Sequence, residues 1–111
     1  MKTKLEPKIK IASRTHVSQS EIMYLESAWN YTCVHTVQKQ LVSSRTLKIF
    51  SNRIDINSFI KINRGLMINI SFIQEINKER KDAFVQLTNG KILPISRRMY
   101  NEVIGSLVRI N

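Results

Sequence analysis

Apolar and polar residues alternate over much of the first 40 positions, which is typical of half-buried β-strands. A short alternating run occurs at residues 8–13. Two runs rich in β-branched and aromatic residues follow at residues 21–27 and 31–37, and only three residues, centred on Trp29, separate them. This spacing predicts a short strand and then a β-hairpin with an aromatic side chain at its tip.

The pattern changes to a helical one after a weaker strand candidate at residues 41–44. Apolar residues then recur at helical spacing, at Leu47, Phe50 and Ile54, and Thr46 is available as an N-cap. We therefore expect one short helix in the middle of the chain.

Alternation returns at residues 59–63 and stops at a turn formed by Arg64 and Gly65. A second apolar strand is expected at residues 72–76. Between the turn and this strand, residues 66–70 are predicted to make one helical turn and to lie in the core.

An Asn–Gly step at residues 89–90 lies between two alternating runs, which is a strong hairpin signal. A two-residue turn there would set Leu87 opposite Ile92. The second run contains Pro94, which has no N–H to donate, so this run is expected at the edge of a sheet.

A helix with one apolar face is predicted after Ser96. If Ser96 is its N-cap, Arg97 and Arg98 occupy the first helical positions, where each opposes the helix dipole by a few tenths to about 1 kcal/mol. Since folding alone prefers acids there, we interpret the pair as converging on an anion site that suits a DNA phosphate or a guanine edge. The alternative is that both arginines are solvated or pair with Glu102.

These elements predict a mainly β fold of antiparallel strands with short helices and a C-terminal amphipathic helix. We expect residues 1–7 to form a flexible N-terminal segment and residues 8–111 a single domain.

The 18 Lys and Arg against 8 Asp and Glu give a net charge of +10. Such a charge favours polyanions or anionic membrane surfaces as partners. A role in solubility alone is the alternative, but acidic residues serve solubility better, so nucleic acid is the favoured partner.

Residues with catalytic chemistry are few and isolated. His16 and His35 fall on different predicted elements, no Cys or His cluster has metal-ligand spacing, and the three glycines form no phosphate loop. The sequence therefore predicts no enzyme, no cofactor and no metal site. The single cysteine, Cys33, is interpreted as a small buried apolar residue.

Cys33 also has no partner for an internal disulfide, and no N-terminal apolar run resembles a secretion signal. No segment approaches the ~20 consecutive apolar residues of a membrane span. We therefore expect a protein of the cytoplasm with no membrane partner.

Three stretches, at residues 24–36, 59–73 and 89–100, closely resemble the LytTR family of bacterial DNA-binding domains in order and spacing. The resemblance covers residues 8–108. It implies an elongated, mostly antiparallel β fold whose loops enter consecutive major grooves of duplex DNA, commonly at direct repeats in promoters, and thus a transcription regulator.

The resemblance also places the DNA contacts. Carried over by position, they are Trp29, Asn30, Tyr31, Asn63, Arg64, Arg97 and Arg98. Arginine can bond O6 and N7 of guanine, and asparagine can bond an adenine edge or a phosphate. For Trp29 we favour packing on a neighbouring side chain.

The chain departs from the family in two respects. Many members have a histidine where Asn63 stands. Members are typically the output half of a response regulator, yet a receiver domain is not encoded here, so the chain is either an excised output domain or a stand-alone member. A receiver domain or histidine kinase pathway, and a homodimer on DNA, are partners that fit the resemblance. The alternative function is a stand-alone protein-interaction or non-specific nucleic-acid-binding module on the same fold.

Overall fold

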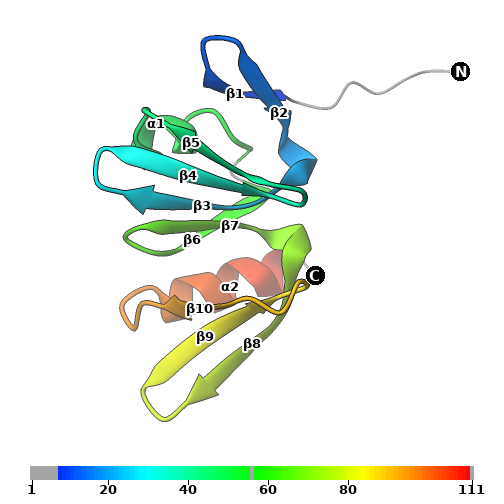
Figure 1. Ribbon diagram of the computed structural model, residues 1–111. Coiled ribbons are helices and arrows are strands. Elements are labelled where there is room, and N and C mark those ends of the chain that lie inside the picture. Colours follow the sequence, from blue (N-terminus) through cyan, green and yellow to red (C-terminus); the bar gives the residue numbers. More distant parts are fainter. Residues whose placement is uncertain (1–7, 56, 111) are drawn as a thin grey trace, which may run out of the picture.

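The computed structural model describes residues 8–55 and 57–110, and the flexible segment predicted at residues 1–7 lies outside this part. Three antiparallel sheets follow one another along the molecule, with one α-helix beside the first two and another behind the third (Figure 1). The principal extents are 45 × 41 × 24 Å. The predicted fold class, mainly β with short helices, is confirmed.

A hairpin of two strands forms the first sheet, and a 3₁₀ turn, η1 (Gln19–Glu21), leads from it into the second. Its strands are β1 (Lys8–Ala12) and β2 (Thr15–Ser18). Ile9 and Ile11 alternate with lysines and point into the core, as the short run at residues 8–13 predicted.

The second sheet has five strands in the order β5-β4-β3-β7-β6. They are β3 (Ile22–Ala28), β4 (Tyr31–Thr36), β5 (Gln40–Ser43), β6 (Phe59–Asn63) and β7 (Leu66–Asn69). Helix α1 (Leu47–Ser51) connects β5 to β6, and Thr46 stands at its N-cap position but makes no side-chain capping hydrogen bond.

The third sheet has the order β10-β9-β8 and is entered through a second 3₁₀ turn, η2 (Ile70–Phe72). Its strands are β8 (Ile73–Glu79), β9 (Asp82–Leu87) and β10 (Ile92–Ile95), and helix α2 (Tyr100–Ile110) follows. Strand β10 is an edge strand, as Pro94 predicted.

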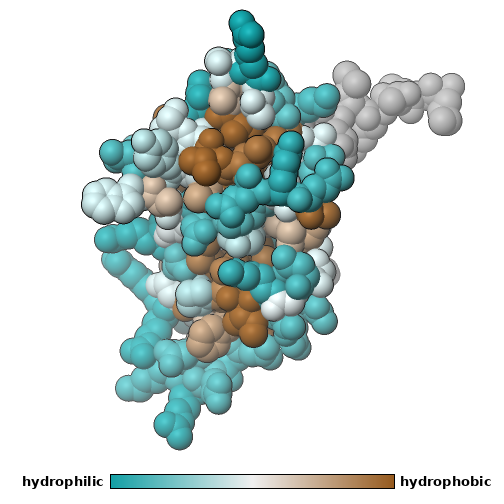
Figure 2. Space-filling view, in the orientation of Figure 1, coloured by the Kyte–Doolittle hydropathy of each residue, from teal (hydrophilic) through white to brown (hydrophobic). Residues whose placement is uncertain are grey.

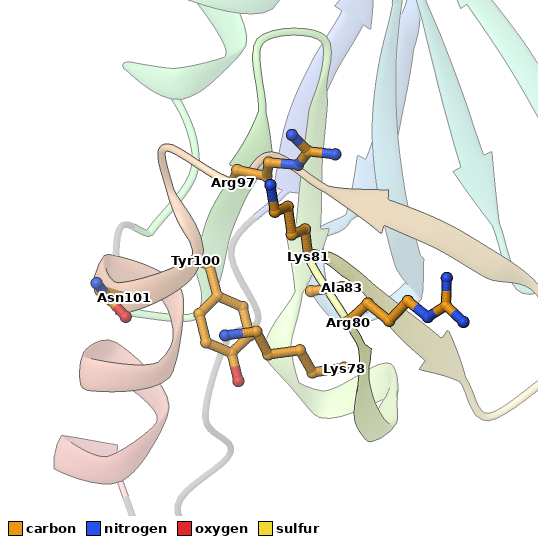
Figure 3. Close-up of a pocket in the computed structure, with 7 residues that line it drawn as sticks. All are labelled: Lys78, Arg80, Lys81, Ala83, Arg97, Tyr100 and Asn101. Atoms are coloured by element: carbon orange, nitrogen blue, oxygen red, sulfur yellow. The ribbon is translucent and has the colours of Figure 1, made fainter.

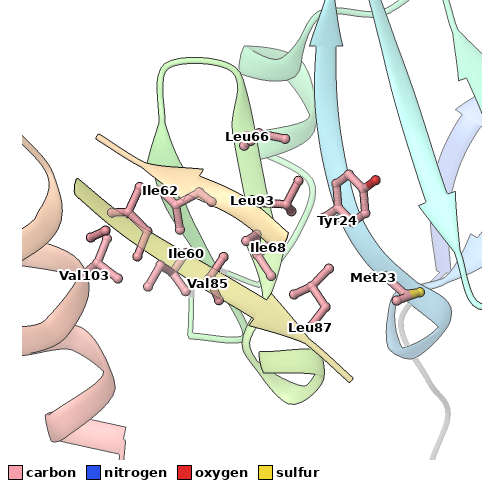
Figure 4. Close-up of a cluster of buried hydrophobic side chains, with 12 residues drawn as sticks. Met23, Tyr24, Ile60, Ile62, Leu66, Ile68, Val85, Leu87, Leu93 and Val103 are labelled. Carbon is pink, nitrogen blue, oxygen red and sulfur yellow. The ribbon is translucent and has the colours of Figure 1, made fainter. Parts of the chain in front are cut away.

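The five-stranded sheet separates two hydrophobic clusters because its side chains alternate between faces. Leu25 and Phe50 belong to the cluster shared with the first sheet and α1. Ile68 and Val85 belong to the cluster shared with the third sheet and α2, which Val103 closes from the helix (Figure 4). Each face of the central sheet is thereby fixed to a neighbouring layer.

The prediction of a helical turn at residues 66–70 was wrong. Leu66–Asn69 is strand β7, whose backbone pairs with both β3 and β6. Two neighbouring strands satisfy more backbone groups of this apolar segment than one helical turn could. The turn comes later, at Ile70–Phe72, where the Asn69 side chain accepts from the Ser71 N–H.

The predicted register of the last hairpin was wrong by one residue. Ile92 pairs with Gln86 rather than with Leu87, because the loop has three residues and ends with Gly90 at φ 89°. The predicted register would have turned Leu93 and Ile95 away from the core.

Helix α2 begins at Tyr100, four residues after the predicted N-cap. The Met99 N–H donates to Ser96 O at 3.0 Å, which closes a turn, and the Val103 N–H then donates to Met99 O in the first helical bond. Arg97 and Arg98 therefore precede the helix, and the predicted conflict with its dipole is smaller than expected.

Within residues 8–55 and 57–110, the structure contains no helix that is both long enough and apolar enough to cross a membrane.

Candidate nucleic-acid interface

Three turns from distant parts of the sequence project from the same side of the molecule, at the left of Figure 1. They are the β3–β4 turn at residues 29–30, the β6–β7 turn at residues 64–65, and the turn at residues 96–99 between β10 and α2. All the residues that the sequence singled out as DNA contacts lie on or beside these turns. We call this side the loop edge.

The β3–β4 turn has two residues, because Ala28 pairs directly with Tyr31. Its first residue, Trp29, has φ 61° and is 96% exposed. The prediction that Trp29 packs on a neighbour was wrong, since the tip extends beyond the sheet. Asn30 is exposed and Tyr31 is 52% exposed, so the whole turn presents its side chains to solvent.

Both the oxygen and the nitrogen of the Asn63 side-chain amide form hydrogen bonds within the protein. Its Oδ1 accepts from the Gly65 N–H at 2.9 Å, which shapes the β6–β7 turn. Its Nδ2 donates to Pro94 O at 2.9 Å, which attaches the turn to β10. The exposed Arg64 is thereby held at the tip of a braced turn.

Backbone hydrogen bonds join the three turns to one another. The Ser27 N–H donates to Gly65 O at 2.8 Å, just before the Trp29 tip. The Ser96 N–H donates to Ile62 O at 2.8 Å, next to the bond from Asn63. The spacing between the turns is therefore set by the backbone, so the turns are positioned before any ligand arrives.

Arg97 and Arg98 do not converge on one point, as the sequence had suggested, because successive residues of the turn face opposite sides. Arg98 lines a hollow of about 570 Å³ with Lys61 and Arg64. Arg97 lines a separate hollow of about 270 Å³ next to the β8–β9 hairpin. The turn places one cation on each side of itself.

The ion-pair partner of Arg97 is Asp82 rather than Glu102. The Arg97 Nη2 and Asp82 Oδ1 atoms are 3.3 Å apart, and the two side chains are 69% and 63% exposed. Exposed pairs of this kind contribute about 0.2–1 kcal/mol, so Asp82 orients the guanidinium without preventing it from binding another anion. Glu102 instead lines the hollow of Arg98.

The space-filling view shows hydrophilic side chains along the loop edge and around the lower part of the molecule (Figure 2). Arg64, Arg97 and Arg98 are all exposed there. A series of cations on braced turns is the electrostatic arrangement that binds a phosphate backbone.

Sequence reasoning named no DNA contact in two further sources of positive charge at this edge. Lys61 lines the hollow of Arg64 and Arg98 from strand β6. The β8–β9 hairpin adds Lys78, Arg80 and Lys81 beside Arg97. The sequence shows these basic residues as a cluster between two predicted β-strands. Only the fold shows that the cluster lies beside Arg97.

His35, one of the isolated residues with catalytic chemistry, makes contacts within the protein. His35 stacks on Tyr24 with ring centroids 4.0 Å apart, and its Nε2 lies 3.0 Å from Glu26 Oε1. Burial, and then the charge of Glu26, raises the pKa of Tyr24. Cys33 is half-buried rather than fully buried. Among the described residues, no group of three or more His, Cys, Asp or Glu side chains is placed to hold a metal ion.

Residues 12–107 of the chain match the LytTr DNA-binding domain family. The chain belongs to this family. As a LytTr domain it is a DNA-binding domain, and its family is not a family of enzymes. The resemblance stated from the sequence is confirmed.

The LytTr fold is also found in a solved structure, the LytTr DNA-binding domain of a putative methyl-accepting/DNA response regulator from Bacillus cereus. The two match with a TM-score of 0.81 and 21% sequence identity, over 92% of this chain and 97% of the other. This likeness confirms the fold. Comparison with curated protein sequences gives no match.

Proposed function

We propose that this LytTr domain binds duplex DNA in a sequence-dependent way, by inserting the turns of the loop edge into consecutive major grooves, and that it regulates bacterial transcription. The observation that carries this proposal is the set of backbone hydrogen bonds that joins the exposed Trp29, Arg64 and Arg97 turns along one side of the molecule. Turns whose backbone is already fixed lose little freedom on binding, which favours the reading of a defined sequence.

The dimensions of the domain support contact with more than one groove. Its longest extent is 45 Å, whereas one turn of B-DNA rises about 34–36 Å. A domain of this length that lies along the duplex covers the distance between two successive major grooves.

The side chains divide into base readers and backbone contacts by their chemistry. Arg64 and Arg97 are proposed to bond O6 and N7 of guanine, which arginine can do with two parallel bonds. Arg98 and Asn30 are proposed to bond phosphates or base edges beside them.

Two of the remaining expected contacts, Tyr31 and Asn63, have narrower roles. Tyr31 offers a half-exposed ring and hydroxyl beside the Trp29 tip. Asn63 uses its oxygen and one amide hydrogen inside the protein, so it offers DNA at most one hydrogen and acts mainly by holding Arg64 in place.

Repeated sites in a promoter, occupied by two copies of the domain, fit the family to which the chain belongs. The activating signal would come from a receiver domain or a histidine kinase pathway. A cytoplasmic location is part of the same proposal.

One observation favours the alternative of a protein-interaction module. Strand β5 is at the edge of the five-stranded sheet, and its Val42 is 62% exposed. An apolar patch covers the region of β4 and β5 in Figure 2. An exposed strand edge with an apolar side chain can accept a strand from another protein.

The experiment that separates these functions is selection of bound duplexes from a random DNA pool, with wild type, Arg97→Ala and the control Lys39→Ala. Lys39 is exposed in the β4–β5 loop, on the side opposite the loop edge (Figure 1). We expect wild type and Lys39→Ala to enrich the same motif, and Arg97→Ala to lose preference at one base position. Binding without enrichment would favour the non-specific alternative.

A further inference from the structure

We propose that the β8–β9 hairpin is a fourth DNA contact, which binds backbone phosphates between its tip and the start of α2. The inference rests on the DNA binding proposed above and adds a backbone clamp beside the base-reading Arg97. It concerns residues that neither the sequence pattern nor the comparisons single out.

The hollow at this hairpin is lined mainly by cations. Its volume is about 270 Å³, and its wall includes Lys78, Arg80, Lys81 and Arg97, together with Tyr100 and Asn101 (Figure 3). None of the described residues that line it is acidic. Asp82, beside Arg97, is the one acid paired with these cations among the described residues, so an anion that enters the hollow is attracted by several positive groups at once.

The basic side chains of this hollow extend in different directions (Figure 3). The Lys78 Nζ lies 4.7 Å from the centroid of the Tyr100 ring, a cation–π contact that orders the ammonium without neutralising it. Lys81 extends toward Arg97, whereas Arg80 extends away from Tyr100 at the hairpin tip (Figure 3). Lys78, Lys81 and Arg97 can therefore surround one phosphate, and Arg80 can reach the next one along the strand.

An acid already occupies one position at the rim. Asp82 Oδ1 lies 3.3 Å from Arg97 Nη2. The carboxylate shows that an anionic oxygen fits beside this guanidinium. Because exposed ion pairs are weak, a phosphate oxygen can replace or join the carboxylate when DNA approaches.

The backbone at the tip is strained, which also indicates a use for the side chain. Glu79 pairs with Asp82, so the turn has two residues, and the first of them, Arg80, has φ 59°. Glycine and asparagine adopt this conformation easily, whereas an arginine there is held at some energetic cost. We therefore infer that the Arg80 side chain acts at the tip of the hairpin.

The position of the hairpin extends the loop edge. In Figure 1 its turn lies on the same side as the turns that carry Trp29, Arg64 and Arg97, at the lower end of the row. A duplex lying along these three turns would pass the hairpin next, with its backbone facing Arg80 and Lys81.

The test compares two double variants that remove the same charge from opposite sides. The hairpin variant is Arg80→Gln with Lys81→Gln, and the control is Lys39→Gln with Lys91→Gln, whose residues lie in the loops opposite the loop edge (Figure 1). All four side chains are exposed, so both proteins should fold, which melting curves verify. DNA affinity is measured against salt concentration on the selected motif and on a scrambled duplex.

We expect the hairpin variant to lower the slope of log affinity against log salt by about 1.8, at ~0.9 per phosphate contact, and to weaken binding roughly 30-fold at 0.15 M salt. Both duplexes should be affected alike, because phosphates carry no sequence. The control should change the slope by less than a third of this amount. Equal slopes for the two double variants would overturn the inference.

A second measurement locates the phosphates. Single neutral methylphosphonates are placed along the motif, one position at a time. At one or two positions, wild type should lose about 5-fold in affinity while the hairpin variant loses nothing further. If both proteins respond alike at every position, the hairpin does not bind the backbone.

This design separates the inference from the function on which it rests. If wild type selects no motif, sequence-dependent binding fails, but the slopes on scrambled DNA still decide the role of the hairpin. If a motif is selected and the two slopes are equal, only the hairpin contact fails.

Discussion

The turns at the loop edge and the turns at the opposite edge of the sheets both reverse the chain, but they do so with different residues. At the opposite edge, the β9–β10 loop places Gly90 at φ 89°, and Asn89 Oδ1 accepts from the Lys91 N–H. At the loop edge, Trp29 and Arg80 take positive φ without glycine. Turn residues agree with the local backbone conformation on one side and conflict with it on the other, which fits the binding role proposed for the loop edge.

The largest effect on stability is expected from the sheet that supports both edges. Ile68 is fully buried in β7, between Tyr24 of β3 and Ile60 of β6. Ile68→Ala should lower the free energy of unfolding by about 2–5 kcal/mol, measured by urea denaturation. DNA affinity of the protein that remains folded should not change, since no binding side chain is altered.

A loop-edge arginine should show the opposite behaviour. Arg64→Ala is expected to cost about 1–3 kcal/mol of specific DNA binding and to leave the urea midpoint nearly unchanged. Arg64→Lys keeps the charge but loses the two parallel bonds, so it should keep non-specific affinity and lose discrimination. Wild-type discrimination in Arg64→Lys would mean that Arg64 acts only through its charge.

Gly90→Ala tests the relaxed turn of the opposite edge. A Cβ at Gly90 would meet nothing within 4 Å, so the cost comes from the backbone alone. We expect a loss of about 1–2 kcal/mol of stability, visible as a lower melting temperature, with DNA binding unaffected. Weaker DNA binding would show that the two edges are not separate in function.

Trp29→Gly is expected to change stability less than Gly90→Ala does, and in the favourable direction. Glycine relieves the positive φ, which should stabilise the fold by up to about 1 kcal/mol, while loss of the exposed ring weakens DNA binding. Trp29→Ala is the control, because it removes the ring and keeps the strain. A stabilised Trp29→Gly with full DNA affinity would leave the exposed tryptophan without a role.

Much of the fold could be predicted because alternation and helical spacing report burial directly. The predictions were wrong where the local sequence is compatible with two backbone conformations. An Asn–Gly step fits a two-residue or a three-residue loop, and the choice depends on Leu93 and Ile95 facing the hydrophobic cluster that the third sheet shares with the central sheet. Residues 66–69 form a strand because β3 and β6 lie on both sides of them.

The candidate site could be predicted as residues but not as an arrangement. Arg64 and Arg97 were named from the sequence, whereas the hydrogen bond from Ser96 to Ile62 that brings their turns together joins positions 34 residues apart, as their numbers show. The cations of the β8–β9 hairpin were overlooked for the same reason. No local pattern tells which turns will share an edge.

The measurement that tests the account most directly is an amide NMR titration of the labelled domain with a bound duplex. Gly65 and Gly90 are matched reporters, because each N–H is hydrogen-bonded within its turn at 2.9 Å and the two turns lie on opposite edges (Figure 1). We predict that the Gly65 resonance shifts with added DNA and that the Gly90 resonance stays in place. A shift of Gly90 with Gly65 unmoved would contradict the assignment of the loop edge as the DNA-binding surface.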